Sequence, residues 1–212
     1  MKGKLVVFEG IDGAGKATQL KLLEKKLRRE GKSVKTFRFP RYEHVVGQFI
    51  KECLAGKHGD FLKLDAYFTA FPYVTDRILA APQIRAALKK SIVLTDRYTP
   101  SNFAFGGAKV RGSLRAAYLK FFEELEYGDA QLPRPDLVLY LDTHVETAQK
   151  QLKRSGKKLD VHERARAYQK EVATLYKQLA RGRNWRSISC KQGESPAKIH
   201  EKIWKAVRGN IR

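Results

Sequence analysis

The chain has 212 residues, a length typical of one compact α/β domain, and 42% of them are apolar, which excludes a wholly disordered chain. Its 43 Lys and Arg residues outnumber its 22 Asp and Glu residues, so the formal net charge is +21. Such a charge attracts polyanions, and both phosphate-rich substrates and nucleic acid are candidates. Because the basic residues are spread along the chain, a solvated basic surface is the simpler explanation.

Nothing in the sequence predicts a membrane or an export route. The longest apolar runs, Leu5–Phe8 and Leu137–Leu141, fall far short of the roughly 20 residues that span a bilayer. The first run also ends too early for the core of a signal peptide. Cys53 and Cys190 are isolated and lack the spacing of metal ligands. We therefore expect a cytoplasmic protein.

Short apolar runs alternate with stretches of helical periodicity. In chain order, the predicted strands are Leu5–Phe8, Val34–Phe37, Ile92–Leu94, Leu137–Leu141 and Trp185–Ser189. The third and fourth are almost wholly apolar, which is typical of strands buried on both faces of a parallel sheet. The helical stretches are Leu20–Leu27, Leu64–Leu88, Leu114–Leu125, Ala165–Leu179 and Ile199–Val207. Pro72 and Pro82 should kink or restart the second of them.

This alternation predicts a three-layer α/β fold, with a five-stranded parallel sheet flanked by helices. No internal repeat or low-complexity linker divides the sequence, so we expect residues 1–212 to form a single domain. The basic segment Lys153–Lys158 is the best candidate for a mobile surface loop.

A phosphate-binding loop is the strongest motif. Gly10, four intervening residues, Gly15 and Lys16 fit the P-loop pattern, between the first strand and the first helix. Glycines let the backbone N–H groups wrap around phosphates, the helix N-terminus adds partial positive charge, and Lys16 adds a full one. The residues expected to bind ATP here are Gly10, Ile11, Asp12, Gly13, Ala14, Gly15, Lys16, Ala17 and Thr18.

One position departs from the pattern. Ser or Thr normally follows the lysine and binds Mg²⁺ through its hydroxyl, whereas this chain has Ala17. Thr18 points about 100° further round the helix, so it cannot simply take over the role. A water at that coordination position, weakened metal binding and loss of catalysis are all compatible with Ala17. We favour catalysis, because the other expected parts are present.

A second polar pair stands at the carboxyl end of the third predicted strand. In this fold class that strand end faces the ligand crevice. We expect Asp96 to hold Mg²⁺ through water and Arg97 to neutralise a phosphate with its fork of donors. Together with Lys16, these residues would form the catalytic centre.

Several motifs together resemble the thymidylate kinases, a family of P-loop nucleoside monophosphate kinases. The segments Phe8–Gln19, Arg38–Pro40, Tyr73–Arg77 and Asp96–Lys109 occur in the order and spacing of that family. The most specific is the Asp-Arg-Tyr segment that ends in Ala-Phe-Gly-Gly-Ala-Lys, and Pro135–Leu141 is similar to the family's fourth strand. The resemblance covers nearly the whole chain. It implies a P-loop kinase fold, phosphoryl transfer from ATP to dTMP with Mg²⁺, and a homodimer.

The resemblance also implies how the acceptor is bound. Arg38 and Arg97 would bind its 5′-phosphate, with Tyr42 nearby. Asp12 would contact the sugar 3′-hydroxyl, and Phe105 would lie against the sugar and disfavour a ribose 2′-hydroxyl.

The base would lie against two further residues. Tyr73 stands where the family places a Phe that stacks on thymine, and a tyrosine ring can do the same. Arg77 would hydrogen-bond the base edge.

Members of this family carry a catalytic charge either inside the phosphate loop or in a lid over ATP. Gly13 stands at the loop position, so the chain resembles the second kind, with its lid at residues 153–163. The basic residues considered for the lid are Arg154, Lys157 and Lys158. The lid Arg of the family's typical Asp-Arg-Ile-Glu stretch aligns with Val161, so the lid residue stays unassigned.

Two alternatives stay open. The first is a different kinase. Tyr73 and Gly106 bear on which nucleobase is preferred, so the acceptor could be another deoxynucleoside monophosphate. A nucleoside kinase needs a carboxylate that deprotonates a hydroxyl, and Glu9 could be proposed for that role. The second is a degenerate module that binds nucleotide or nucleic acid without turnover, which Ala17 and the net charge permit. The apolar stripe of Leu114–Leu125 fits a dimer interface or an intramolecular core equally well.

Overall fold

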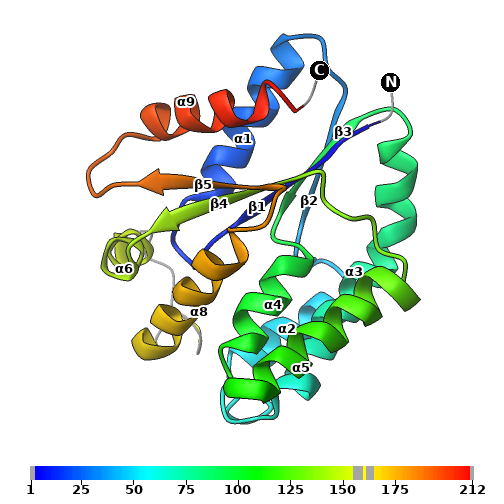
Figure 1. Ribbon diagram of the computed structural model, residues 1–212, viewed down its shortest axis with the longest axis vertical. Helices are drawn as coiled ribbons and strands as arrows, with labels where there is room; N and C mark the ends of the chain where they lie inside the picture. The colour runs from blue at the N-terminus through cyan, green and yellow to red at the C-terminus, as the bar shows by residue number, and fades with distance from the viewer. Residues whose placement is uncertain (1–2, 155–159, 161–164, 211–212) are drawn as a thin grey trace.

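The computed structural model describes residues 3–154, 160 and 165–210 (Figure 1). Its centre is a parallel five-stranded sheet with the order β2-β3-β1-β4-β5. The strands are β1 (Leu5–Glu9), β2 (Val34–Arg38), β3 (Ile92–Asp96), β4 (Leu137–Thr143) and β5 (Trp185–Cys190). Each predicted strand is confirmed, and each begins at the predicted residue and continues slightly further at its carboxyl end.

The central strands are buried on both faces, as their apolar sequences predict. All five residues of β1 and of β3 are buried, because helices cover both sides of the sheet. Alternate residues therefore enter different cores. Val6 and Phe8 pack into the core on one face, whereas Leu5 and Val7 pack into the core on the other.

Helices form the two outer layers of the fold. One core is covered by α1 (Lys16–Arg29), α6 (Val145–Arg154), α8 (Arg166–Leu179) and α9 (Pro196–Val207). The other is covered by α3 (Ala66–Leu88). Figure 1 shows α1 and α9 side by side on one side of the sheet, with α3 on the other. The predicted three-layer α/β fold is confirmed.

A group of helices beyond α3 extends the molecule on that side. It consists of α2 (Val45–Leu54), α4 (Thr99–Gly107), α5 (Gly112–Glu123) and the short π-helix η1 (Glu124–Asp129). The sequence did not predict α2 or α4. Tyr118 and Phe122 of α5 pack on α3 in a separate small core, so the inner side of the predicted α5 stripe is intramolecular.

The long helix α3 begins where a side chain caps it. The Asp65 carboxylate accepts hydrogen bonds from the Tyr67 and Phe68 N–H groups. The helix does not restart at Pro72 or Pro82, although each proline removes one internal N–H donor. Packing of its buried face outweighs those losses, and one rigid element therefore carries both Tyr73 and Arg77.

Within the described ranges, no helix combines the length and the apolar character that a bilayer crossing needs. Both cysteines are free and buried. Most of the predicted mobile loop and lid, at residues 155–159 and 161–164, lies outside the described residues, together with Lys157, Lys158 and Val161.

Candidate active site

The strand order brings the predicted catalytic parts together. The strands β2, β3 and β1 are neighbours in the sheet, and all three end at the same edge. Arg38 ends β2, Asp96 ends β3, and Glu9 ends β1 and leads into the phosphate loop. In the register of the sheet, Asp96 stands opposite both Phe8 and Arg38. This edge is where ligands bind in open parallel sheets.

The phosphate loop has the backbone shape that its glycines predict. Gly10, Gly13 and Gly15 have φ angles of 141°, 80° and 86°, which side-chain-bearing residues rarely adopt. The loop wraps around the Lys16 ammonium, whose Nζ donates to the carbonyl oxygens of Gly10 at 3.0 Å and Ile11 at 2.8 Å. Lys16 is thereby held at the N-terminus of α1, where helix N–H groups favour anions.

Burial changes the acidity of this lysine. Loss of water around the ammonium, reinforced by the positive charge of Arg97, lowers the pKa of Lys16 from 10.5 to about 8. The carboxylates of Asp96, Asp12 and Glu9 oppose this shift. A polyphosphate at the loop would supply the anionic partner that such a buried ammonium needs.

Gly13 packs closely against α6. A Cβ atom at this position would lie 2.4 Å from the Ala148 carbonyl oxygen, and the φ angle is also positive. The chain therefore has no room for an arginine inside the loop. This agrees with the expectation that the charge comes from the lid, and Arg154 stands exposed at the end of α6.

The structure offers few protein ligands for a metal. Ala17 and Thr18 are both exposed on the first turn of α1. In the described part of the chain, no three His, Cys, Asp or Glu side chains group into a metal site. Asp96 does offer a buried carboxylate, 3.7 Å from the Arg38 guanidinium. One carboxylate together with substrate phosphates and water fits Mg²⁺, which keeps most of its water.

Arg97 contacts residues from several parts of the site. Its backbone adopts a φ of 66°, which is costly for a residue with a side chain and typical of functional positions. Its Nη2 binds the Asp12 carboxylate at 2.6 Å, and its Nη1 donates to the hydroxyls of Ser101 and Tyr176. The guanidinium lies over the Phe105 ring, with Cζ 4.7 Å from the ring centroid.

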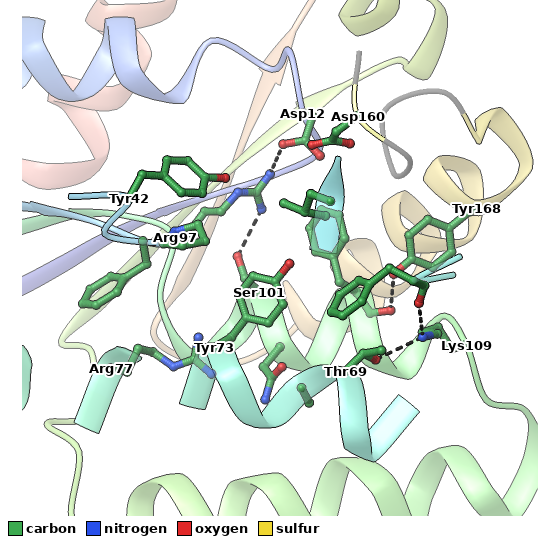
Figure 2. A pocket seen from close by; sticks show the side chains of 18 residues that line it. Asp12, Tyr42, Thr69, Tyr73, Arg77, Arg97, Ser101, Lys109, Asp160 and Tyr168 are labelled. Carbon is green, nitrogen blue, oxygen red and sulfur yellow. Dashed lines mark hydrogen bonds and ion pairs between the residues drawn. The ribbon is translucent and has the colours of Figure 1, made fainter. Parts of the chain in front are cut away.

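A pocket of about 710 Å³, including its open mouth, lies beside the phosphate loop, within the size range of small-molecule sites. Figure 2 shows Arg97, Asp12, Tyr73 and Tyr42 gathered around it. The predicted acceptor residues among its lining are Asp12, Tyr42, Tyr73, Arg77, Arg97 and Phe105. Arg38 is not among the lining residues, and its side chain is 69% exposed beside Asp96.

Glu9 is not the free base that a nucleoside kinase would need. Its carboxylate is fully buried and accepts hydrogen bonds from the N–H groups of Tyr98 and Ser101 and from the hydroxyls of Ser101 and Tyr176. These contacts join β1, α4 and α8 beneath Arg97. Its oxygens bind four donors and it is not among the lining residues of the pocket, so the structure favours a structural role for Glu9 over a role as a catalytic base.

Sequence reasoning missed an ion pair that shapes the pocket wall. Arg41 and Asp76 are buried and bind through Nε and Oδ1 at 2.8 Å. Asp76 also accepts from the Arg41 backbone N–H. The pair fixes the loop after β2 to the middle of α3, next to Arg77. No local pattern reveals it, because charged residues usually indicate solvent-facing positions.

Lys109 is a second residue whose role the motif did not specify. It lines the pocket, and its Nζ donates to the Phe61 carbonyl at 2.9 Å and the Thr69 hydroxyl at 3.0 Å (Figure 2). Burial lowers its pKa to about 8. Lys109 thus connects the end of α4 to the start of α3 and to the loop before it.

A P-loop that opens beside a pocket lined by Arg97, whose side chain is 14% exposed, has the parts for moving a phosphoryl group onto a small anionic acceptor. This is the arrangement of the P-loop nucleoside monophosphate kinases, which are phosphotransferases.

The comparisons with known proteins identify the family. The family model "Thymidylate kinase" matches residues 8–203. The chain is 34% identical over 213 residues to the thymidylate kinase of Pelotomaculum thermopropionicum, covering 98% of this chain and 94% of that protein. It is 31% identical over 183 residues to that of Mycobacterium tuberculosis, covering 83% and 85%. The chain belongs to the thymidylate kinase family.

A solved structure supports the fold independently. The structure of the thymidylate kinase of Candida albicans matches with a TM-score of 0.78, covering 99% of this chain and 92% of that one. The sequence identity is only 22%, so this match supports the fold alone.

Proposed function

We propose that this chain is a thymidylate kinase that transfers the γ-phosphoryl group of ATP to dTMP, giving ADP and dTDP. The proposal rests above all on the position of Arg97. This residue lines the pocket and also binds Asp12 of the phosphate loop, so it connects the two parts of the site. Membership of the family supplies the acceptor. Residues 1–212 would act as one kinase domain with a lid near residues 153–163.

In this proposal the two nucleotides are bound by different parts of the site. The phosphate loop, from Gly10 to Thr18, and Lys16 bind the ATP phosphates, and Arg154 is the described candidate for the lid charge. Asp96 would help to hold Mg²⁺, which when bound neutralises charge on the phosphate oxygens.

Arg97, joined by Arg38, would hold the acceptor so that its phosphate oxygen faces the γ-phosphorus. A bond forms between these two atoms as the bond from the γ-phosphorus to the bridging oxygen breaks. The acceptor phosphate is already ionised, so no catalytic base is required. This agrees with the finding that Glu9 is engaged in structural hydrogen bonds.

The pocket wall supports a deoxynucleotide as the acceptor. Phe105 lies beneath the Arg97 guanidinium, where it would pack against the sugar and disfavour a 2′-hydroxyl. Tyr73 would stack on the base, and Arg77 would bind its edge. We propose a cytoplasmic site of action. Binding of nucleic acid, which the net charge permits, is not part of this proposal.

A panel of acceptors tests the function. Mg²⁺-dependent formation of ADP from ATP would be measured with dTMP, dUMP, dGMP, dCMP and UMP. We expect selective turnover with dTMP, which would also show that Ala17 is tolerated. Selective turnover with another monophosphate would support the same mechanism but refute dTMP as the acceptor.

The pKa of Lys16 predicts a pH dependence for ATP binding. Its pKa is lowered to about 8, so the free protein carries this charge below that pH and loses it above. With ATP varied at saturating dTMP, kcat/KM should fall as pH rises through about 8, approaching roughly tenfold per pH unit. Saturating dTMP removes the effect of Lys109 titration on dTMP binding from the result. A flat profile up to about pH 9.5 would contradict this role for Lys16.

We also propose that the protein is a homodimer through the outer face of α3. Its exposed residues from Phe68 to Leu79 include Phe71 and Ile78, and none of them is charged. Phe121 of α5 extends this surface, in edge contact with Phe71. Two copies that each carry a formal charge of +21 repel one another, so an uncharged apolar face is where a second copy would bind.

The dimer is tested by sedimentation analysis of Leu79→Glu, which places a buried charge in the proposed interface. We expect a dimer for the wild type and a monomer for this variant, because an unpaired buried charge is costly. Ala197→Glu, on the exposed side of α9 across the sheet, is the matched control and should remain dimeric. A monomeric wild type, or a dimeric Leu79→Glu variant, would refute the interface.

A further inference from the structure

The carboxylate of Glu126 is fully buried, unlike those of its neighbours Glu123 and Glu124. It lies on η1, where α5 widens into a π-helical turn in which the Ala130 N–H donates to the Leu125 carbonyl at 2.9 Å. Such turns are rare and frequently occur at functional sites. Here the turn places an acidic side chain in the interior.

Glu126 binds two residues of the pocket wall. Arg77 donates from Nε to Oε2 at 2.6 Å and from Nη2 to Oε1 at 2.8 Å. The Asn102 amide donates from Nδ2 to the same Oε1 at 3.0 Å. Arg77 and Asn102 both line the pocket, and Figure 2 shows Arg77 beside Tyr73.

These contacts determine which hydrogen-bonding atoms of Arg77 and Asn102 remain for a ligand in the pocket. An ionised carboxylate has only acceptors, so Asn102 must direct its NH₂ group to Glu126 and its Oδ1 away from it. Within the described ranges no donor binds Oδ1. Arg77 binds Glu126 through Nε and Nη2, and no contact between described residues uses its Nη1, so the N–H groups of Nη1 can donate to a ligand in the pocket that Arg77 lines. The pocket wall thus offers a ligand a fixed donor, Arg77, and a fixed acceptor, Asn102 Oδ1.

We propose that Glu126 is a positioning residue that sets the base preference, by holding Arg77 as a donor and Asn102 as an acceptor for an imide edge. In such an edge, as in thymine, a carbonyl oxygen stands next to a ring N–H. The inference rests on the proposed function, because it assigns the base-reading part of the same pocket. Glu126 does not line the pocket, so it acts through its two partners.

On the same edge, cytosine has a donor where thymine has an acceptor, and an acceptor where thymine has a donor. Its amino group would meet the donors of Arg77, and its unprotonated ring nitrogen would meet the Oδ1 acceptor of Asn102. Both contacts would be unfavourable, and the polar groups of the wall would lose their partners. Leaving such buried groups unpaired discriminates strongly between substrates. Without Glu126, the Asn102 amide could rotate and present its NH₂ group to this ring nitrogen.

The test is the ratio of kcat/KM for dTMP to that for dCMP in Glu126→Gln. Glutamine is nearly isosteric, but it presents a donor as well as an acceptor and removes the charge that orients Arg77. We expect the ratio to fall by about tenfold or more, the worth of one hydrogen bond to a charged group. The KM for ATP should be unchanged. Glu126→Asp, which keeps an acceptor-only group, should restore part of the ratio.

A purely structural role for Glu126 would lower turnover of both acceptors together and leave the ratio unchanged, which would overturn the proposal. Glu124→Gln, an exposed change in the same π-helix, is the matched control and should keep the wild-type ratio. If Glu126→Gln does not fold, Asn102→Ala decides, because it removes the acceptor and leaves the Arg77–Glu126 pair intact. An unchanged ratio in that variant would likewise overturn the proposal.

Calorimetric binding of dTMP and dCMP separates this inference from the proposed function. Affinities do not depend on turnover, so a wild type that binds dTMP selectively but transfers no phosphate refutes the function only. A wild type that phosphorylates dTMP, with a Glu126→Gln variant of equal selectivity in binding, refutes the inference only.

Discussion

Lys16→Ala should lower kcat/KM by roughly 10²–10³-fold or more, the usual cost of removing a preorganised charge from a site of developing negative charge. Lys16 is buried, and the loop carbonyls of Gly10 and Ile11 hold its ammonium at the start of α1. No other described lysine occupies this loop. Turnover with dTMP, thermal melting and circular dichroism would be measured on the same sample.

Alanine keeps the helix and removes only the ammonium, so the fold of this variant should survive. Lys21→Ala, an exposed lysine one turn further along α1, is the matched control and should keep wild-type turnover. Unchanged turnover in a folded Lys16→Ala variant would contradict the assignment of the phosphate loop.

Arg97→Lys should lower kcat/KM for dTMP by roughly 10²-fold, although it conserves the charge. Arginine binds Asp12 through Nη2 while Nη1 binds Ser101 and Tyr176, and its planar group packs over Phe105. Lysine has one nitrogen and no planar group, so it cannot orient a phosphate and hold these partners at once. The measurement is steady-state kinetics with dTMP varied at saturating ATP.

Arg85→Lys is the control for that substitution. Arg85 is exposed on α3, and among the described residues its side chain donates to the Gln131 carbonyl alone, at 3.3 Å, so this change should leave the kinetics unaltered. If Arg97→Lys also matches the wild type, Arg97 binds no phosphate in the reaction, and the bridge between the loop and the pocket has no catalytic role.

The sequence predicts those parts of the site whose signals are local. The strands are recognisable because each is a short apolar run, and the phosphate loop because its glycines and Lys16 have a fixed spacing. Asp96 and Arg97 follow directly from the end of β3. The strand order then brings these segments to one edge of the sheet, as expected for parallel α/β folds.

The parts that the sequence did not predict depend on partners far apart in the chain. Glu126 reads as an exposed acidic residue at the end of a helix, and only the fold shows that it pairs with Arg77, 49 residues earlier. Asp76 likewise pairs with Arg41 across 35 residues. Buried charges require complementary partners, and no periodicity in a single sequence shows which residues will meet.

The prolines of α3 illustrate the same limit. Local propensity predicts that Pro72 and Pro82 kink or restart the helix, and α3 does not restart at either of them. Its contacts with the sheet and with α5 involve Ala70, Ala80 and Ala81, and they favour one continuous element. Tertiary packing here outweighs the local preference.

We expect this chain to move the γ-phosphoryl group of ATP onto the phosphate of dTMP, despite Ala17. The most direct test incubates the wild-type protein with Mg²⁺, dTMP and ATP labelled at the γ-phosphate, and follows the label among the products. We expect the label to appear in dTDP, with an equal amount of ADP. Label that stays in ATP, or appears only as inorganic phosphate, in a folded sample that binds ATP, would contradict it and favour a degenerate nucleotide-binding module.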